Sequence, residues 1–521
     1  MWVASQLLLI SCWACHAHLS TNGVHIVNAS TGQRVRLKCV NWYGAHQEPL
    51  VPGGLEVTSA DNIADLIALM GANCVRLPLS DQGVLNDPMI DPYFIMGRNA
   101  SALQVLDTVV SSLTCRGLMV ILNSHTTTPG WVGLEGAHEE VPQGLWHGGN
   151  ISTTEWVRGL ALVSARYSSN PLVIGIDIRN EIHDQGDTII TWGRSKDVDS
   201  DWLAAATIAE DGIAAVNPHM LIIVSGLCRA YDIRPLMDSP GPSAALERDK
   251  LVFSTHVYPF SWWWENIYWL WVMYVAIIVF IFSSLLLICV DTPPSFCCLE
   301  FNILIGSFLP FAVIWIAVAC VKLLISRGVG CETLANESTY WIIAGVCLLL
   351  VSAASNIHLL LTEDDFMLPL VKGFLCWTRL LCVVVVIFSY VTGTYWMVLD
   401  DLRRWRLEAR TVPVFVGEFG TVVGDNTVQW GYLNRVLHEF DLDFAYWAVN
   451  GRKWRNGVWE TENYGLLNYN YSGLADKTFA DTTQSAVVLA RLAGCSISNK
   501  RNPSLDMMRA TNSSIDSSSP T

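Results

Sequence analysis

Four long apolar stretches interrupt the second half of this 521-residue chain. They cover Ile267–Val290, Phe301–Ile325, Tyr340–Leu361 and Val371–Leu399. Each reaches the roughly 20 residues that a helix needs to cross a bilayer. An even number of crossings returns the chain to the side of the membrane on which it started. The sequences before and after this apolar block can therefore fold together into one domain.

The composition also indicates a chain that lies partly in lipid. Hydrophobic residues make up 51% of the sequence and the mean hydropathy is +0.34, which is too apolar for an ordinary soluble protein. The formal net charge of −15 excludes nucleic acids and anionic membrane surfaces as partners, because both would be repelled.

Cysteine and histidine spacings give no sign of a metal. The pair Cys12 and Cys15 falls in a presumed signal sequence, and no HExxH motif occurs. We therefore expect no metal and no cofactor. Cys39, Cys74 and Cys115 lie in or near predicted core elements, where we expect free, buried thiols.

Eight short apolar segments outside the block have the character of buried strands, with spacers of helix length between most of them. They are Leu37–Trp42, Cys74–Leu77, Met119–Leu122, Val173–Ile178, Leu221–Ser225, Leu251–Thr255, Val414–Gly417 and Phe444–Ala448. Strands that alternate with helices form parallel sheets, and eight such units match a closed barrel. We predict an α/β fold, a (β/α)8 TIM barrel interrupted between its sixth and seventh strands by a four-helix transmembrane insertion.

The predicted organisation has five parts. They are a signal peptide at 1–17, the first part of the barrel at 20–263, the transmembrane insertion at 264–400, the second part of the barrel at 401–495 and a disordered tail at 496–521. The signal rests on a short apolar core followed by small residues. The tail is rich in Ser, Asn and Thr.

The predicted barrel lies on the lumenal or extracellular side of a multi-pass protein of the secretory pathway or cell surface. Asn-X-Ser sequons, which such a location allows to be glycosylated, begin at Asn28, Asn99, Asn150, Asn336, Asn470 and Asn512. The positive-inside rule opposes this orientation, because Arg403, Arg404 and Arg406 fall on the proposed lumenal side. We assign these arginines to a barrel helix before the seventh strand.

Two strand-like runs far apart in the sequence each lead to a glutamate. IGIDIRNEIHD (174–184) contains Glu181, and VPVFVGEFGT (412–421) contains Glu418. In a (β/α)8 barrel the catalytic groups stand at the C-terminal ends of the strands. Hydrolysis of a glycosidic bond needs one carboxylic acid to protonate the leaving oxygen and a second carboxylate to attack the sugar or to activate water.

Ten ordered motifs resemble glycoside hydrolase family 5, the cellulase family of clan A, and in particular its endoglucanase-like members. They are LKCVNWYG (37–44), NCVRLPLS (73–80), VILNSH (120–125), DIRNEIHD (177–184), TWG (191–193), VNPHMLIIVSG (216–226), LVFSTHVYP (251–259), VGEFGT (416–421), FAYWAVN (444–450) and YGLLN (464–468). The resemblance implies a retaining mechanism with Glu181 as acid/base and Glu418 as nucleophile, their carboxyls roughly 5–5.5 Å apart.

The resemblance also assigns supporting residues. Arg76 would keep the nucleophile ionised and Tyr258 would donate to it, whereas Glu181 would need a raised pKa. The resemblance further places Asn180 at the sugar 2-hydroxyl and Trp447 against the sugar face. It assigns His125 and His256 to the binding of hydroxyls or to tuning of the acid. Trp42 and Trp146 would extend the cleft, with packing in the core as the alternative for these two.

Two positions depart from the family pattern. Ile182 follows the acid where family members usually have proline, and the third-strand motif reads NSH where an aspartate is common. Neither change replaces a group that does chemistry. A larger departure is the apolar block, which follows Tyr258 on the catalytic face of the predicted barrel.

The preferred hypothesis is a membrane-anchored retaining hydrolase that cleaves O-glycosidic bonds in β-glucan-type polysaccharide. The alternative enzyme hypothesis is that a site beside lipid acts on glycolipid headgroups, as in endoglycoceramidase-like relatives. A non-catalytic sugar-binding membrane sensor is the third hypothesis, although it predicts loss of one carboxylate and both are present. A transporter or channel is disfavoured, because the apolar stretches carry few charges that could line a pathway.

Overall fold

The computed structural model describes residues 18–132, 143–233, 249–258, 412–420 and 441–475, together with Leu236, Leu433 and Leu437. The predicted signal peptide, transmembrane insertion and tail lie outside these residues. Within the described ranges, no helix has both the length and the apolar character that crossing a membrane requires.

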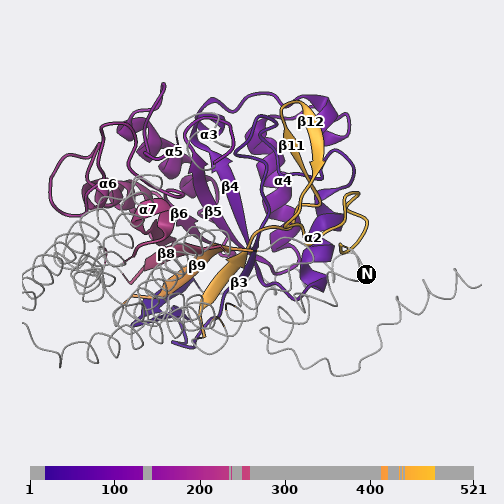
Figure 1. Ribbon diagram of the computed structural model, residues 1–521. Coiled ribbons are helices and arrows are strands. Elements are labelled where there is room, and N and C mark those ends of the chain that lie inside the picture. Colours follow the sequence, from indigo (N-terminus) through magenta and orange to yellow (C-terminus); the bar gives the residue numbers. More distant parts are fainter. Residues whose placement is uncertain are drawn as a thin grey trace, which may run out of the picture.

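Eight parallel strands form a closed barrel (Figure 1). They are β3 (Lys38–Asn41), β4 (Cys74–Ser80), β5 (Met119–Thr126), β6 (Val173–Asp177), β7 (Leu221–Ser225), β8 (Leu251–Val257), β9 (Val414–Phe419) and β10 (Asp443–Tyr446). Each strand pairs with the next along the chain, and β10 closes the ring on β3. The eight predicted strand segments and the parallel barrel are thus confirmed.

Strands β8 and β9 join the two separate parts of the sequence. Phe253 faces Val414 and His256 faces Glu418 across this parallel pair. The prediction that the sequences flanking the apolar block build one barrel is therefore confirmed. The same pairing places His256 beside one of the two candidate glutamates.

The barrel interior has an apolar layer at the N-terminal ends of the strands. Ile121, Ile223 and Phe415 belong to this buried cluster, and so do Cys39 and Cys74. These two cysteines occupy facing positions of β3 and β4 and form a disulfide. The expectation of free thiols at both positions is wrong, because parallel neighbours in register bring the two Cα atoms within 4.2 Å. Cys115 carries a free thiol but is exposed, not buried.

A hairpin that we did not predict covers this end of the barrel. It consists of β1 (Leu19–Asn22) and β2 (His25–Asn28), and Leu19 and Ile26 pack into the apolar layer. The backbone N–H of Thr21 donates to the carbonyl of Asp249 just before β8. With this end closed, the opposite, C-terminal end of the strands is left for the site.

Helices pack around the outside of the barrel (Figure 1). They are α2 (Ala60–Leu69), α3 (Asp81–Asn86), the 3₁₀ helix η1 (Pro92–Ile95), α4 (Ala102–Thr114), α5 (Thr153–Arg166), α6 (Trp202–Ala214) and the short α7 (Leu227–Ala230). Capping boxes begin α4, with Ser101 and Gln104, and α5, with Ser152 and Glu155. These reciprocal bonds satisfy backbone N–H groups that a helix start leaves unpaired.

A second hairpin follows β10 at the C-terminal end of the barrel. Its strands are β11 (Arg452–Arg455) and β12 (Val458–Thr461). The connecting residues Asn456 and Gly457 both have positive φ, at 50° and 77°, as a tight two-residue hairpin turn requires.

Candidate active site

The two candidate glutamates lie opposite each other at the C-terminal end of the barrel strands, which we call the mouth. Glu418 lies within β9, and Glu181 follows the end of β6 by four residues. One carboxylate oxygen of each and a ring nitrogen of His256 all lie within 4.8 Å of one another. A sugar linkage placed here would contact both carboxyl groups.

Glu418 is buried and its two oxygens have different donors. Arg76 Nη1 lies 2.7 Å from Oε1, and the Tyr258 hydroxyl donates to Oε2 at 2.8 Å. Burial raises the pKa of Glu418, while His256, Arg76 and Tyr258 pull it down. The net direction is upward because desolvation outweighs the nearby cation, which was expected to keep Glu418 ionised. Both donors nevertheless bind the ionised form best.

The side chain of Glu181 is less buried than that of Glu418. In the part of the chain that the structure describes, no arginine or lysine side chain contacts its carboxyl group directly. His256 Nδ1 lies 2.9 Å from its Oε1. Burial raises the pKa of Glu181, and the more distant charges of Arg229 and Arg76 oppose that rise. This direction is the one expected of a group that is to donate a proton. The backbone of Glu181 has φ = 39°, a left-handed conformation that is costly for a non-glycine residue and that clusters at active sites and ligand clamps.

The two histidines at the mouth are neutral near pH 7. Burial lowers the pKa of His256 to about 4 and that of His125 well below its usual value. His125 Nδ1 lies 2.8 Å from Asn123 Oδ1 and 4.0 Å from Glu418 Oε1. Neutral imidazoles can both donate and accept, so they can orient carboxyl and hydroxyl groups without adding charge.

Asn180 and Trp447 complete the predicted set. Asn180 Oδ1 accepts from Arg76 Nη2 at 2.9 Å, which directs the amide NH₂ group elsewhere as a donor. Trp447 is half-buried and stacks on Tyr43 with ring centroids 4.8 Å apart and an interplanar angle of 2°. It also stacks on His125 at 5.7 Å, so its ring plane is fixed at the mouth.

The structure does not place Trp42 and Trp146 in the cleft. Both are fully buried. The indole N–H of Trp42 donates to the Gly53 carbonyl at 2.8 Å, and that of Trp146 donates to the Val198 carbonyl at 3.0 Å. Trp146 packs against Trp202 with ring centroids 5.0 Å apart. Assigning these two tryptophans to an extended cleft is therefore wrong, and the packing alternative holds.

Sequence reasoning missed two partners of Arg76. Asp177 Oδ2 accepts from Nε at 3.0 Å and from Nη2 at 2.7 Å, and Asn41 Oδ1 accepts from Nη1 at 2.9 Å. Arg76 is the third residue of β4. The signal for Asp177 was its position within an apolar strand, where a carboxylate must be buried and therefore needs a cation.

Glu181, His256 and Glu418 also have the spacing of metal ligands. Two features of the site argue against a cation there. Both oxygens of Glu418 already accept hydrogen bonds, and the Arg76 guanidinium, 2.7 Å from one of them, would repel a metal ion. The arrangement suits proton transfer and nucleophilic attack better than metal binding.

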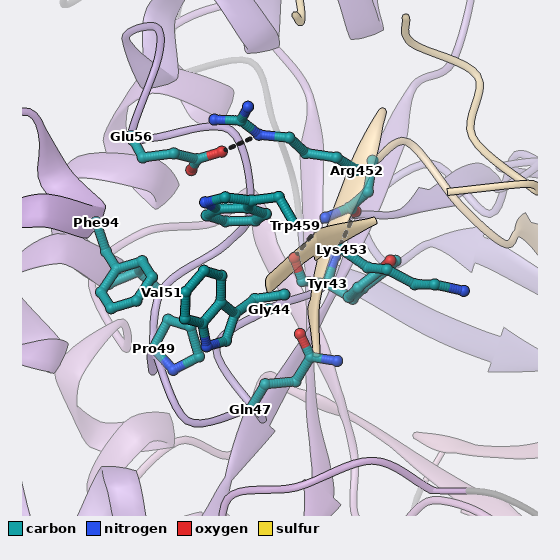
Figure 2. A pocket seen from close by; sticks show the side chains of 13 residues that line it. Tyr43, Gly44, Gln47, Pro49, Val51, Glu56, Phe94, Arg452, Lys453 and Trp459 are labelled. Carbon is teal, nitrogen blue, oxygen red and sulfur yellow. Dashed lines mark hydrogen bonds and ion pairs between the residues drawn. The ribbon is translucent and has the colours of Figure 1, made fainter. Parts of the chain in front are cut away.

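A shallow hollow, partly open to solvent, lies beside Tyr43, the residue on which Trp447 stacks (Figure 2). Its lining includes Tyr43 and Gln47 from the segment after β3, Phe94 from η1, and Trp454 and Trp459 from the second hairpin. The Arg452 guanidinium covers the Trp459 ring at 4.5 Å from its centroid. The sequence signal that could have found this hairpin is the Asn456–Gly457 pair, which is typical of a two-residue hairpin turn.

Residues 30–266 match the family model described as cellulase (glycosyl hydrolase family 5). Curated relatives of this chain include a glycosyl hydrolase 5 family protein of Chamaecyparis obtusa, 30% identical over 285 residues, which are 50% of this chain and 48% of that protein. An endoglucanase of Paenibacillus polymyxa is 32% identical over 215 residues, 40% of this chain and 49% of that protein. The chain spans about half the length of the curated relatives it matches.

Solved structures similar to this barrel include an endoglucanase and an endocellulase. The catalytic domain of the major endoglucanase from Xanthomonas campestris pv. campestris matches with a TM-score of 0.53 and 19% identity, covering 92% of this chain and 100% of that chain. A cellotetraose complex of the endocellulase from Pyrococcus horikoshii matches with a TM-score of 0.52 and 18% identity, covering 92% and 99%. At these identities the likeness is one of fold.

Proposed function

We propose that this protein is a retaining glycoside hydrolase that cleaves O-glycosidic bonds in β-glucan-type polysaccharide, with Glu181 as acid/base and Glu418 as nucleophile. The observation that carries the proposal is the pairing of these two carboxyls, with oxygens no more than 4.8 Å apart. Retaining enzymes hold the carboxyl groups about 5–5.5 Å apart, whereas inverting enzymes leave about 6.5–9.5 Å for a water.

The two environments support different roles for the two groups. In the first step Glu418 attacks the anomeric carbon while Glu181 gives its proton to the departing glycosidic oxygen, so that a glycosyl ester forms and an alcohol leaves. In the second step Glu181 takes a proton from water, which attacks the same carbon and releases Glu418. The amide NH₂ of Asn180 donates to the 2-hydroxyl, and Trp447 offers its flat ring to the sugar face.

The proposed substrate class rests on the substrates named for similar proteins. The endoglucanases among them and the cellotetraose complex support a β-linked glucan, and the proposed role is polysaccharide catabolism. No nucleic acid partner is proposed, given the net charge of −15.

We propose further that residues 264–400 anchor the barrel in a membrane of the secretory pathway or the cell surface. The four apolar stretches support the anchor. The Cys39–Cys74 disulfide supports an oxidising compartment. The sequon residues Asn28, Asn99, Asn150 and Asn470 are at least partly exposed, as glycosylation requires.

A glycolipid substrate is the second candidate. The apolar sequence begins a few residues after Tyr258, whose hydroxyl donates to Glu418. Because the predicted membrane segment follows Tyr258 so closely in the sequence, the active site would suit a sugar headgroup carried by a lipid.

The test is hydrolysis of a panel of aryl β-glycosides, soluble β-glucans and glycosphingolipids by the detergent-solubilised full chain. Activity should fall by several orders of magnitude in Glu418→Gln, because the nucleophile is lost. Glu210→Gln is the matched control, since Glu210 is a buried glutamate of α6, and it should retain full activity. Proton NMR of the first product should show the β anomer. The absence of activity above the Glu418→Gln background on every substrate would favour the sugar-binding sensor instead.

A further inference from the structure

The guanidinium of Arg76 is fully buried and uses every one of its N–H groups. Nε and one Nη2 hydrogen point to Asp177 Oδ2, the other Nη2 hydrogen to Asn180, and the two Nη1 hydrogens to Asn41 and Glu418. A guanidinium has five donors in a rigid plane. Its position is therefore fixed by four side chains, and only one of these, Glu418, belongs to the proposed catalytic pair.

Asp177 holds the side of this plane that faces away from Glu418. It is fully buried in β6, with no exposed surface through which a substrate could reach it. Its oxygen Oδ2 takes both bonds from Arg76, while Oδ1 has no hydrogen-bond partner within the described part of the chain. A buried carboxylate oxygen without a hydrogen-bond partner costs free energy of folding. A contribution to the stability of the fold therefore does not explain why an aspartate occupies position 177.

We propose that Asp177 is a positioning residue that aims Arg76 at Glu418 and Asn180 and cancels the charge of Arg76, so that Glu181 keeps its proton. The inference rests on the proposed function. Among the described residues at the mouth, one cation, Arg76, contacts two carboxylates directly, Asp177 and Glu418. Glu181 is the third carboxyl and has no such contact within the described ranges. The positive charges of Arg229 and Arg76 favour the ionised form of Glu181, and a carboxylate bonded to Arg76 offsets the charge of Arg76.

The other titratable groups around Arg76 do not supply the negative charge that Asp177 provides. His125 from β5, His256 from β8 and His46 after β3 are neutral near pH 7 because burial lowers their pKa values, and Tyr258 remains protonated because burial raises its pKa. Arg179 is paired with Asp81 at 3.2 Å. Arg229 of α7 adds a positive charge near Glu181, which opposes the protonated form.

Asp177→Asn separates charge from position. An asparagine oxygen in place of Oδ2 preserves both bonds to Arg76, and the NH₂ group occupies the place of Oδ1. With the negative charge gone, Arg76 acts on Glu418 and Glu181 without compensation, so the pKa values of both should fall. Asp177→Ala removes the bonds as well and should also misplace Arg76.

The experiment is the pH dependence of kcat/KM for the full chain on the substrate found in the panel. In Asp177→Asn both limbs of the bell-shaped profile should move about one pH unit or more toward acid, which corresponds to a charge acting at several ångströms. At a fixed pH on the alkaline limb, kcat/KM should therefore fall about tenfold when the limb moves by about one pH unit. Asp177→Ala should lower kcat at every pH.

The matched control is Asp443→Asn. Asp443 is also a buried aspartate paired with an arginine, with Arg34 Nη2 at 2.9 Å, but it lies at the N-terminal end of β10. Its variant should leave the pH profile in place. A profile of Asp177→Asn that superposes on that of the wild type would overturn the inference while leaving the proposed function intact.

A second measurement does not need turnover. Carboxyl-carbon NMR titration of protein labelled with ¹³C-glutamate reads the pKa of Glu181 directly, with Glu181→Gln identifying its resonance. The pKa should be lower in Asp177→Asn than in the wild type and in Asp443→Asn. Equal values in all three proteins would overturn the inference, whether or not the enzyme hydrolyses any substrate tested.

Discussion

The Cys39–Cys74 disulfide should contribute substantially to the stability of the barrel. It joins two fully buried side chains on neighbouring strands, 35 residues apart in the sequence. In the chain-entropy model, a cross-link over a loop of this length destabilises the unfolded chain by about 4 kcal/mol at 25 °C. For a domain of this size, where 1 kcal/mol corresponds to roughly 2 °C, the loss of the disulfide should lower Tm by about 8 °C.

The perturbation is the double variant Cys39→Ala/Cys74→Ala, with thermal unfolding of the detergent-solubilised full chain followed by calorimetry. Cys115→Ala is the control, because Cys115 carries a free thiol at the surface, and its Tm should equal that of the wild type. A double variant that melts within about 2 °C of the control would refute the reasoning, since the cross-link would then restrict little of the unfolded chain.

Two further predictions concern single aromatic side chains. Burial lowers the pKa of His46 to about 3. The ordinary pKa of a histidine is about 6.5. At pH values between these two, the unfolded chain therefore binds a proton at His46 that the folded protein does not bind. Stability should therefore be lost as pH falls from about 6.5 toward 3, by up to about 4–5 kcal/mol for this one group, and His46→Phe should show a flatter decline of Tm with acid; identical Tm against pH curves would contradict this. Trp146→Ala should cost about 3–5 kcal/mol of stability, as expected for a buried aromatic residue, whereas Trp447→Ala should reduce kcat/KM with little change in Tm. Equal effects of the two tryptophan variants on Tm, measured side by side, would argue against their different placement.

The barrel could be predicted from the sequence because its strands are buried on both sides. Continuous apolar runs such as residues 173–176 and 221–224 are typical of parallel strands, and the number of such runs predicts an eight-stranded barrel. The apolar block did not hide this pattern, since Val414–Phe419 has the same character as the strands before it. The convergence of Glu181 and Glu418 follows from the position of each at the C-terminal end of its strand.

The failures have a common physical origin, since each depends on which side chains meet in three dimensions. Whether Cys39 and Cys74 pair depends on strand register, which the sequence does not state. The burial of Trp42 and Trp146 depends on backbone carbonyls that accept their indole N–H groups. The raised pKa of Glu418 depends on how completely water is excluded from it, which the identity of its charged neighbours in the sequence does not reveal.

The pairing of β8 with β9 also determines when the fold can be completed. Strand β8 ends at Val257 and β9 begins at Val414, and at about 5–20 residues per second the ribosome needs roughly 10–30 s to pass from one to the other. During that time six strands exist without the two that close the ring, so β8 and β3 each present an unpaired edge of the kind that invites aggregation. Closure is a late, long-range event, and nascent chains of this protein should depend on chaperones until β9 and β10 emerge.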